Sequence, residues 1–404
     1  MRDKRLLIVS AILMTTFIGF GIIIPVMPEI IKATGAAGFE KHTGYMLAVY
    51  SAVSFILSPF WGGLSDRIGR RPIILVGVVG FGISFLLFGI SSGNLALMYL
   101  SRVLGGLFSG AVASVIVAYV ADITTNENRT KGMAFVGVSI GLGFTIGPAV
   151  GGFLSVITLE TPFFVASALA FITFILAFLY LKESLTPDKR RKSSEPRVSR
   201  WKAFTGPLKY LYVLAFFVTF TLAGLEATLQ IYGMIRFDVT PLQVGILFFV
   251  CGFVGALVQG GFVRRKIKKG EEPKYIAIGL VISAIGFFML LGAHSLWWAT
   301  TSMAVFGIGN SLIRPCVTSL ITQKTTVGQG VASGLSSSMD SLGRIVGPLA
   351  GTFLFTISFG PSFISDGGLP YVSGGVLCIA ALWLLVRFRK SDQIQERKLV
   401  VDNE

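Results

Sequence analysis

Twelve long apolar segments, separated by short polar stretches, constrain this 404-residue chain more than any other feature. A helix needs roughly 20 apolar residues to cross a hydrocarbon core of about 30 Å. Within lipid only helices and closed barrels satisfy their own backbone hydrogen bonds, so runs of this length predict an all-α membrane protein. The predicted spans are 6–31, 44–65, 72–92, 95–121, 130–157, 161–181, 207–235, 240–264, 273–294, 296–322, 329–358 and 368–388.

The composition excludes a soluble multidomain protein. Hydrophobic residues make up 53% of the chain and charged residues 14%, whereas soluble domains average about 45–50% and about 25%. Cys251, Cys316 and Cys378 stand singly in apolar segments, so we expect neither disulfides nor a metal site. The apolar run over 6–24 is too long for a signal peptide, which indicates an uncleaved first span.

Basic residues are distributed unevenly between alternate loops, and this asymmetry predicts the orientation. If the N-terminus is cytoplasmic, the outer loops hold only Lys32, Lys41 and Arg236. The inner segments then carry Arg2, Lys4, Arg5, Arg67, Arg70, Arg71, Arg129, Lys131, Lys274, Arg387, Arg389, Lys390 and clusters at 189–192 and 264–269. Cytoplasmic loops are enriched in Lys and Arg, so both termini are predicted inside. The net charge of +15 is thus spread over short loops that face membrane lipids, which argues against a nucleic-acid partner.

An internal repeat divides the chain into two similar parts. Gly-Pro-Ala-Val-Gly-Gly at 147–152 is echoed 200 residues later by Gly-Pro-Leu-Ala-Gly at 347–351, and the glycine pair at 62–63 by that at 260–261. Such symmetry predicts two six-helix bundles related by a pseudo-two-fold axis, with the substrate site near the midplane. The expected parts are an N-terminal bundle (1–183), a cytoplasmic linker (184–206), a C-terminal bundle (207–390) and a cytoplasmic tail (391–404).

Fixed glycines and charges form the loop after the second predicted span. The stretch reads Gly62-x-x-x-Asp66-Arg67-x-Gly69-Arg70-Arg71. We expect Gly62 to allow close helix packing, Gly69 to permit a tight turn, and the charges to lock neighbouring helix ends at the cytoplasmic surface. A loop that merely obeys the positive-inside rule is the alternative, but that rule requires no acid and no fixed glycines.

Small residues and a proline recur at helical spacing in the fifth span. They are Gly143, Gly147, Pro148, Gly151 and Gly152. Proline bends a helix and small residues let another helix approach closely. The segment is therefore expected to act as a pivot or a seal, with plain helix packing as the alternative.

Charged residues inside spans mark candidate functional positions, because charges are costly in lipid and usually face a cavity. Glu226 lies well inside the seventh span, where a low-dielectric environment disfavours the charged carboxylate and lets it hold a proton. The alternative is a structural Glu226 satisfied by Gln230 or another partner.

Further charges lie in the fourth, tenth and eleventh spans. Arg102 sits one or two turns inside the fourth span, and snorkelling to the interface is its alternative role. Asp340 and Arg344 are spaced i,i+4 and can pair along one helix face, which makes a structural role an alternative to proton coupling. Arg314 places a cation near Asn310 in the tenth span.

At this point the sequence resembles the major facilitator superfamily, whose signature loop joins helices two and three. Other stretches narrow the resemblance to the twelve-span drug:proton antiporters, the bacterial multidrug and tetracycline-type exporters. They are Gly19–Pro28 in the first span, Arg102 with Gly105-Gly106 in the fourth, Asp122 with Glu127 and Arg129 after it, and the Gly-Pro motif of span five. The resemblance covers nearly the whole chain. It implies the major facilitator fold, a proton-coupling role for Glu226 and Arg102, and a conformational latch that includes Asp122. It also implies an acid near Arg314, where this chain has none within the tenth span.

The resemblance implies proton-coupled efflux of lipophilic small molecules by alternating access across a bacterial cytoplasmic membrane. An exporter of one metabolite, such as a sugar or amino-acid derivative, is the first alternative, and a non-transporting membrane sensor is the second. We expect no enzyme, because no catalytic triad, zinc motif or dinucleotide fingerprint is present. Without a P-loop, the expected energy source is a proton gradient and not a cofactor. The expected assembly is a monomer.

Overall fold

The computed structural model describes residues 4–91, 93–125, 128–186, 204, 206–268, 270–325, 329–357 and 366–401. The basic cluster at 189–192, most of the expected linker and Glu127 lie outside the described residues. The helices are α1 (Lys4–Ala33), α2 (Phe39–Ile68), α3 (Arg70–Ile90), α4 (Leu95–Ile123), α5 (Arg129–Leu154), α6 (Thr161–Tyr180), α7 (Leu208–Arg236), α8 (Pro241–Leu257), α9 (Arg264–Lys266), α10 (Glu272–Leu291), α11 (Leu296–Lys324), α12 (Gln329–Phe355) and α14 (Leu369–Val401).

Eleven helices among the described residues are long and apolar enough to cross a membrane. The remaining long helix, α12, is comparable in length but polar along much of its course, since it carries five serines, Asp340 and Arg344. The expectation of an all-α membrane fold is therefore confirmed.

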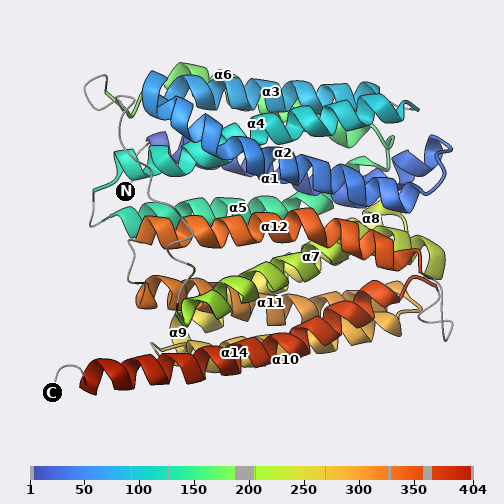
Figure 1. Cartoon of the computed structure of the whole chain (residues 1–404). Coiled ribbons are helices and arrows are strands. Elements are labelled where there is room, and N and C mark those ends of the chain that lie inside the picture. Colours follow the sequence, from blue (N-terminus) through green and yellow to red (C-terminus); the bar gives the residue numbers. More distant parts are fainter. Residues whose placement is uncertain are drawn as a thin grey trace. The chain divides into compact units, whose positions relative to one another are not determined.

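The chain divides into two compact units. The first comprises Met1–Glu195 with Val239–Phe249, and the second comprises Pro196–Asp238 with Val250–Glu404. In the first unit α1 packs on α5 and α6, and α3 packs on α4 and α6, which lie beside it in Figure 1. A core of buried aliphatic side chains, including Ile12, Ile74 and Val115, joins α1, α3 and α4.

The second unit repeats this pattern of packing. There α7 packs on α12 and α14, and α10 packs on α11 and α14. The correspondence places the Gly-Pro sequences of α5 and α12 at matching contacts, against α1 in the first unit and against α7 in the second. The sequence repeat therefore reflects a repeat of helix packing.

Helix ends depart from the predicted spans at three places. α2 begins at Phe39 and not at 44, because a polar first turn precedes its apolar stretch. The last helix runs on to Val401, well beyond the predicted end at 388, since no glycine or proline interrupts 391–401. α8 continues into a π-helical turn, η3 (Val258–Val263), which contains the second glycine pair. Such turns insert an extra residue and are frequent at functional positions.

Candidate functional site

The signature loop of the first unit is held by Arg70. Its guanidinium lies 2.6 Å from Asp66 Oδ1 and 3.1 Å from Asp122 Oδ2, and it donates a 2.7 Å hydrogen bond to Ser65 Oγ. Arg70 is 8% exposed, whereas the side chains of Asp66 and Asp122 are 31% and 24% exposed, so a buried arginine meets two partly solvated acids. One arginine thereby joins the end of α2 and the end of α4 at the start of α3.

The turn that makes this arrangement possible depends on Gly69. Gly69 has a φ of 111° and a ψ of 159°, a backbone conformation that residues other than glycine rarely adopt. The prediction that Gly62 allows close helix packing is wrong, because a Cβ added at Gly62 would have no atom within 4 Å in the described structure. Arg67 is exposed, and Arg71 donates to the backbone carbonyl of Phe178 at 2.7 Å.

Glu183 is a residue of this loop that the sequence reasoning missed. Its carboxylate accepts the backbone N–H groups of Arg70 at 2.9 Å and of Arg71 at 3.1 Å. The carboxylate accepts hydrogen bonds from N–H groups that have no partner within the helix, because they lie in its first turn. Its negative charge also interacts favourably with the positive end of the α3 dipole. The available signal was an acid two residues after Leu181, the last apolar residue of the sixth span.

Replacing Arg70 tests the latch directly. Arg70→Gln is expected to lower the free energy of unfolding by about 1–3 kcal/mol, the range for a lost hydrogen-bonded charge whose partners are partly solvated. Arg67→Gln, an exposed arginine of the same loop, is the matched control and should leave stability unchanged. Thermal melting of the two variants purified in detergent gives the comparison, and equal melting temperatures would contradict the latch.

The corresponding corner of the second unit is held by a buried acid in place of an arginine. Glu272, 4% exposed, accepts hydrogen bonds from Gln323 Nε2 at 2.8 Å and from Ser319 Oγ at 3.3 Å. Gln323 lies 201 residues after Asp122, close to the offset of the repeat. In the second unit, neutral donors at the end of α11 thus hold the start of α10, whereas in the first unit an arginine at the start of α3 pairs with an acid at the end of α4.

The glycines of α5 form a seam against α1. A Cβ on Gly147 would lie 2.8 Å from the Ile18 carbonyl oxygen, and one on Gly143 would lie 2.7 Å from Phe17 Cβ. Gly151 faces the main chain of Ile22 in the same way. Pro148 lies inside α5, and its ring Cδ fits against Gly21 of α1. Main chain therefore approaches main chain along this seam.

Gly152 completes the motif from another side of α5. A Cβ on Gly152 would lie 2.9 Å from Leu242 Cα, in the 239–249 segment that belongs to the first unit. The successive glycines Gly151 and Gly152 thus allow close packing against two different segments, α1 and residues 239–249.

Arg102 is enclosed by aromatic rings in the first unit. Its guanidinium carbon lies 4.5 Å from the ring centre of Phe88, 5.3 Å from that of Phe85 and 5.9 Å from that of Tyr50. The side chain is 1% exposed, so it does not snorkel to a surface, and Nη2 donates to Ser101 Oγ at 3.3 Å. Ring faces attract a desolvated cation by about 2 kcal/mol or more, which offsets part of its burial.

Glu226 lies in the middle of α7 and is 8% exposed. Its Oε2 atom is 3.7 Å from Nη1 of Arg344 on α12. Gln230, one turn further along α7, is also buried. A carboxylate that must leave water is stabilised by an opposite charge at this distance, and the pair costs less than either charge alone.

Asp340 pairs with Arg314 of α11. Their closest atoms, Oδ2 and Nη2, are 3.4 Å apart, and Thr219 of α7 donates a 2.7 Å hydrogen bond to the other oxygen. The i,i+4 spacing suggested a pair between Asp340 and Arg344 along α12, and the structure shows each of them in an ion pair with another helix, Asp340 with Arg314 of α11 and Arg344 with Glu226 of α7. The acid near Arg314 is thus supplied by α12 and not by the tenth span.

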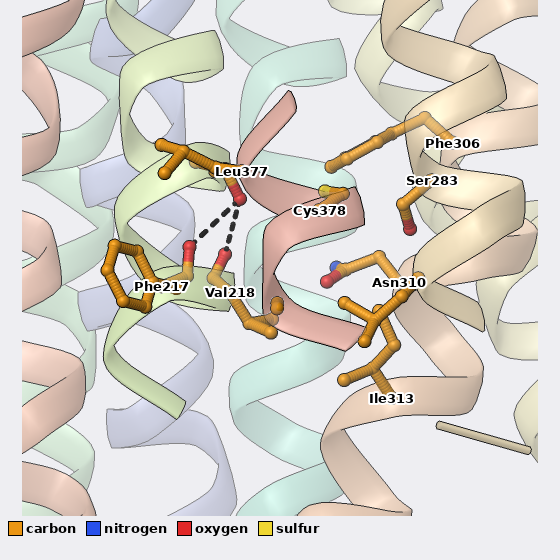
Figure 2. Close-up of a pocket in the computed structure, with 11 residues that line it drawn as sticks. Phe217, Val218, Ser283, Phe306, Asn310, Ile313, Leu377 and Cys378 are labelled. Atoms are coloured by element: carbon orange, nitrogen blue, oxygen red, sulfur yellow. Dashed lines mark hydrogen bonds between the residues drawn. The ribbon is translucent and has the colours of Figure 1, made fainter. Parts of the chain in front are cut away.

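Asn310 lines a cavity inside the second unit, between α7, α10, α11 and α14. Figure 2 shows its amide and the hydroxyl of Ser283 directed into the space beside Cys378. The remaining lining is mainly apolar and comprises Phe217, Val218, Thr221, Leu280, Phe306, Ile313, Leu377 and Ala381. A few polar groups among apolar walls are typical of sites for small lipophilic molecules.

The structure therefore brings four of the predicted residues, Glu226, Asp340, Arg314 and Asn310, into one unit, with Gln230 buried nearby on α7. Arg102, the latch and the glycine seam belong to the other unit. Within the described residues, no group of three or more His, Cys, Asp or Glu side chains is arranged to hold a metal ion.

Known proteins resemble this chain over most of its length. Multidrug resistance protein 2 of Bacillus subtilis (strain 168) is 31% identical over 369 residues, which are 90% of this chain and 92% of that protein. Quinolone resistance protein NorA of Staphylococcus aureus (strain MRSA252) is 30% identical over 363 residues, 88% of this chain and 91% of NorA.

Solved structures share the fold. A crystal structure of the human organic anion transporter MFSD10 covers 95% of this chain and 99% of its own, at a TM-score of 0.70 and 24% identity. An inward-facing, unoccupied bacterial homolog to the human lysosomal transporter Spinster covers 97% and 98%, at a TM-score of 0.74 and 17% identity. The family model described as Major Facilitator Superfamily matches residues 9–348. From this match and the shared fold, the chain is a multi-pass membrane protein that belongs to the major facilitator superfamily.

Proposed function

We propose that this protein exports lipophilic small molecules across a bacterial cytoplasmic membrane in exchange for protons, by alternating access. The observation that carries the proposal is the buried Glu226 carboxyl in the middle of α7, opposed by Arg344. A carboxyl in this setting changes its partner when it takes up a proton, because the neutral acid no longer attracts the guanidinium. The names of the relatives, multidrug and quinolone resistance proteins, support export of drug-like compounds.

The remaining predicted residues take supporting roles in this proposal. Arg102 is assigned to proton coupling in the first unit, and Asp340, Arg314, Asn310 and Gln230 to substrate binding or coupling in the second. Asp66, Arg70 and Asp122 stabilise one conformational state, and the seam at Gly147 keeps α5 rigid against α1. The protein works as a carrier and not as an enzyme, is a monomer, and has both termini in the cytoplasm, as the basic inner loops indicate.

Mainly apolar cavity walls favour a lipophilic substrate over a sugar derivative, which would require a denser set of hydrogen-bonding groups. The proposed bundles are residues 1–183 and 207–390, joined by a linker over 184–206 and followed by a tail over 391–404.

Reconstituted protein tests the exchange. Proteoliposomes are loaded with a pH-sensitive dye and prepared with an interior more acidic than the surrounding buffer. They should release protons when a transported compound is added outside, and liposomes without protein should not. A panel of cationic, neutral and anionic lipophilic compounds identifies the substrate range. Absence of compound-dependent proton movement over the whole panel would end the proposal.

A further inference from the structure

The end of α8 departs from regular helical geometry at η3 (Val258–Val263), directly before α9. A π-helical turn closes its hydrogen bonds between residues i and i+5, so it contains one residue more than the α-helical turn it replaces. None of the six residues of η3 is buried. Packing of buried side chains therefore does not hold this turn in the π form.

Gly260 and Gly261 lie at the centre of η3. In the described structure, a Cβ added at either position would have no atom within 4 Å. Glycine is thus not required here for close approach of another helix, in contrast to Gly307 of α11, where an added Cβ would lie 2.5 Å from the Cys251 carbonyl oxygen. Glycine disfavours an α-helix relative to alanine, so the pair lowers the preference of this turn for the α form.

The part of α8 before η3 is packed on α11, and the part after it is held more loosely. A Cβ on Gly255 would lie 3.5 Å from the Gly307 carbonyl oxygen, so the two helices are still close one turn before η3. Within η3, the ring of Phe262 meets that of Tyr275 at 5.7 Å between centres, yet Phe262 is 43% exposed. The boundary between the fixed and the loosely held part of α8 therefore falls at η3.

The first unit has the corresponding glycine pair in a regular helix. There α2 stays α-helical through the pair, and Arg70 holds its last turn through Ser65 and Asp66. The residues at the corresponding positions after the second pair are Val263 and Arg264, whose side chains offer an arginine no acceptor. The end of α8 thus lacks the groups that fix the end of α2.

A turn that can absorb a displacement follows α9. It includes Gly270, which has a φ of 96° and no atom within 4 Å of an added Cβ in the described structure. If η3 closes as an α-helix, α9 advances by one residue step, which is a rise of about 1.5 Å and a rotation of about 100°. The exposed cations Arg265 and Lys266 then point in a new direction, while the packed part of α8 stays in place.

We propose that η3 is a register switch, in which the turn alternates between the π and the α form and rotates the end of α8 about its own axis. The second unit can then move this end without breaking an ion pair. The first unit, in contrast, must break the contacts of Arg70 to move the end of α2. The inference goes beyond the proposed exchange and requires no substrate.

Distances between spin labels test the switch on the full chain in lipid nanodiscs. Cys251→Ala removes the partly exposed native thiol, and the two buried ones remain. Labels at Lys266→Cys and Arg389→Cys report the end of α8, and labels at Ala256→Cys and Arg389→Cys report α8 before η3; all three positions are exposed. Double electron–electron resonance should show two distances for the first pair and one for the second. A label roughly 5–6 Å from the helix axis is displaced by about 8 Å when the helix rotates by about 100°.

Variants of the glycine pair assign the two distances to η3. Gly260→Ala with Gly261→Ala meets no steric obstacle and favours the α form. The ratio of the two distances should shift about tenfold, a part of the roughly 30-fold by which two alanines favour an α-helix over two glycines. Deletion of Gly260 removes the extra residue itself and should leave a single distance. Gly137→Ala with Gly141→Ala is the matched control and should leave the ratio unchanged, because both glycines are exposed in the regular helix α5 and an added Cβ meets no atom within 4 Å in the described structure.

A single distance for the Lys266 pair in the protein with both glycines would overturn the inference without any further variant. Two distances for the Ala256 pair would also overturn it, because the whole of α8 or α14 would then move. The same holds if the double alanine variant leaves the ratio unchanged. No compound is added in these measurements, so their outcome is independent of whether the proposed exchange occurs.

Discussion

Replacing Glu226 by glutamine is expected to abolish proton-coupled export while leaving the protein folded. Glutamine has nearly the same shape but no proton to release, so the substitution keeps the packing in α7 and removes the exchange. The rate of compound-dependent proton movement in proteoliposomes should fall by at least about 100-fold, the lower end of what a positioned proton-transfer group contributes. Glu226→Asp retains a titratable carboxyl and should preserve measurable exchange.

Glu40→Gln provides the matched control for this result. Glu40 is an acid in the first turn of α2, in the other unit, and it lies far from the middle of any predicted span. The same chemical change there should leave exchange at the wild-type rate. Export by Glu226→Gln at the wild-type rate would refute the assignment of Glu226 as the exchanging group.

A valine in the seam between α1 and α5 should have the largest effect on stability. A Cβ at Gly151 would lie 2.8 Å from Ile22 Cα, and main-chain atoms cannot move aside without shifting the whole of α1. Overpacking usually costs about 1–3 kcal/mol, and a clash with backbone falls at or above the upper end of that range. Gly151→Val is therefore expected to yield little folded protein, or protein with a strongly lowered melting temperature.

The same substitution elsewhere on α5 separates the clash from the loss of a glycine. Gly141 lies on the same helix, is exposed, and has no atom within 4 Å of an added Cβ in the described structure. Gly141→Val should keep the wild-type melting temperature or raise it slightly, because valine favours a helix more than glycine does. Equal melting of the two variants in fluorescence-detected size-exclusion chromatography would show that the seam is loose.

The sequence predicted the helices well, because a run of apolar residues must be as long as the membrane is thick. It also predicted that Arg70 and Asp122 belong together, through the resemblance, and the structure brings them to 3.1 Å. The last helix was cut short at 388, since hydropathy marks where lipid contact ends and not where helical hydrogen bonding ends.

Partners of the charged residues were harder to predict from the sequence. Spacing indicates which side chains share a face of one helix, so it suggested Asp340 with Arg344. It contains no information on which helix packs opposite, and the actual partners, Arg314 and Glu226, lie on α11 and α7. Glu183 was missed for the same reason, because its role depends on the start of α3, more than a hundred residues earlier.

The seams between α1 and α5 and between α7 and α12 have an evolutionary consequence. Where backbone touches backbone, the joint depends on the absence of side chains and not on their identity. Residues on the remaining faces of these four helices are then free to vary without loosening the frame. One fold built this way can carry substrates of very different chemistry, because substitutions in the cavity lining leave these helix–helix contacts unchanged.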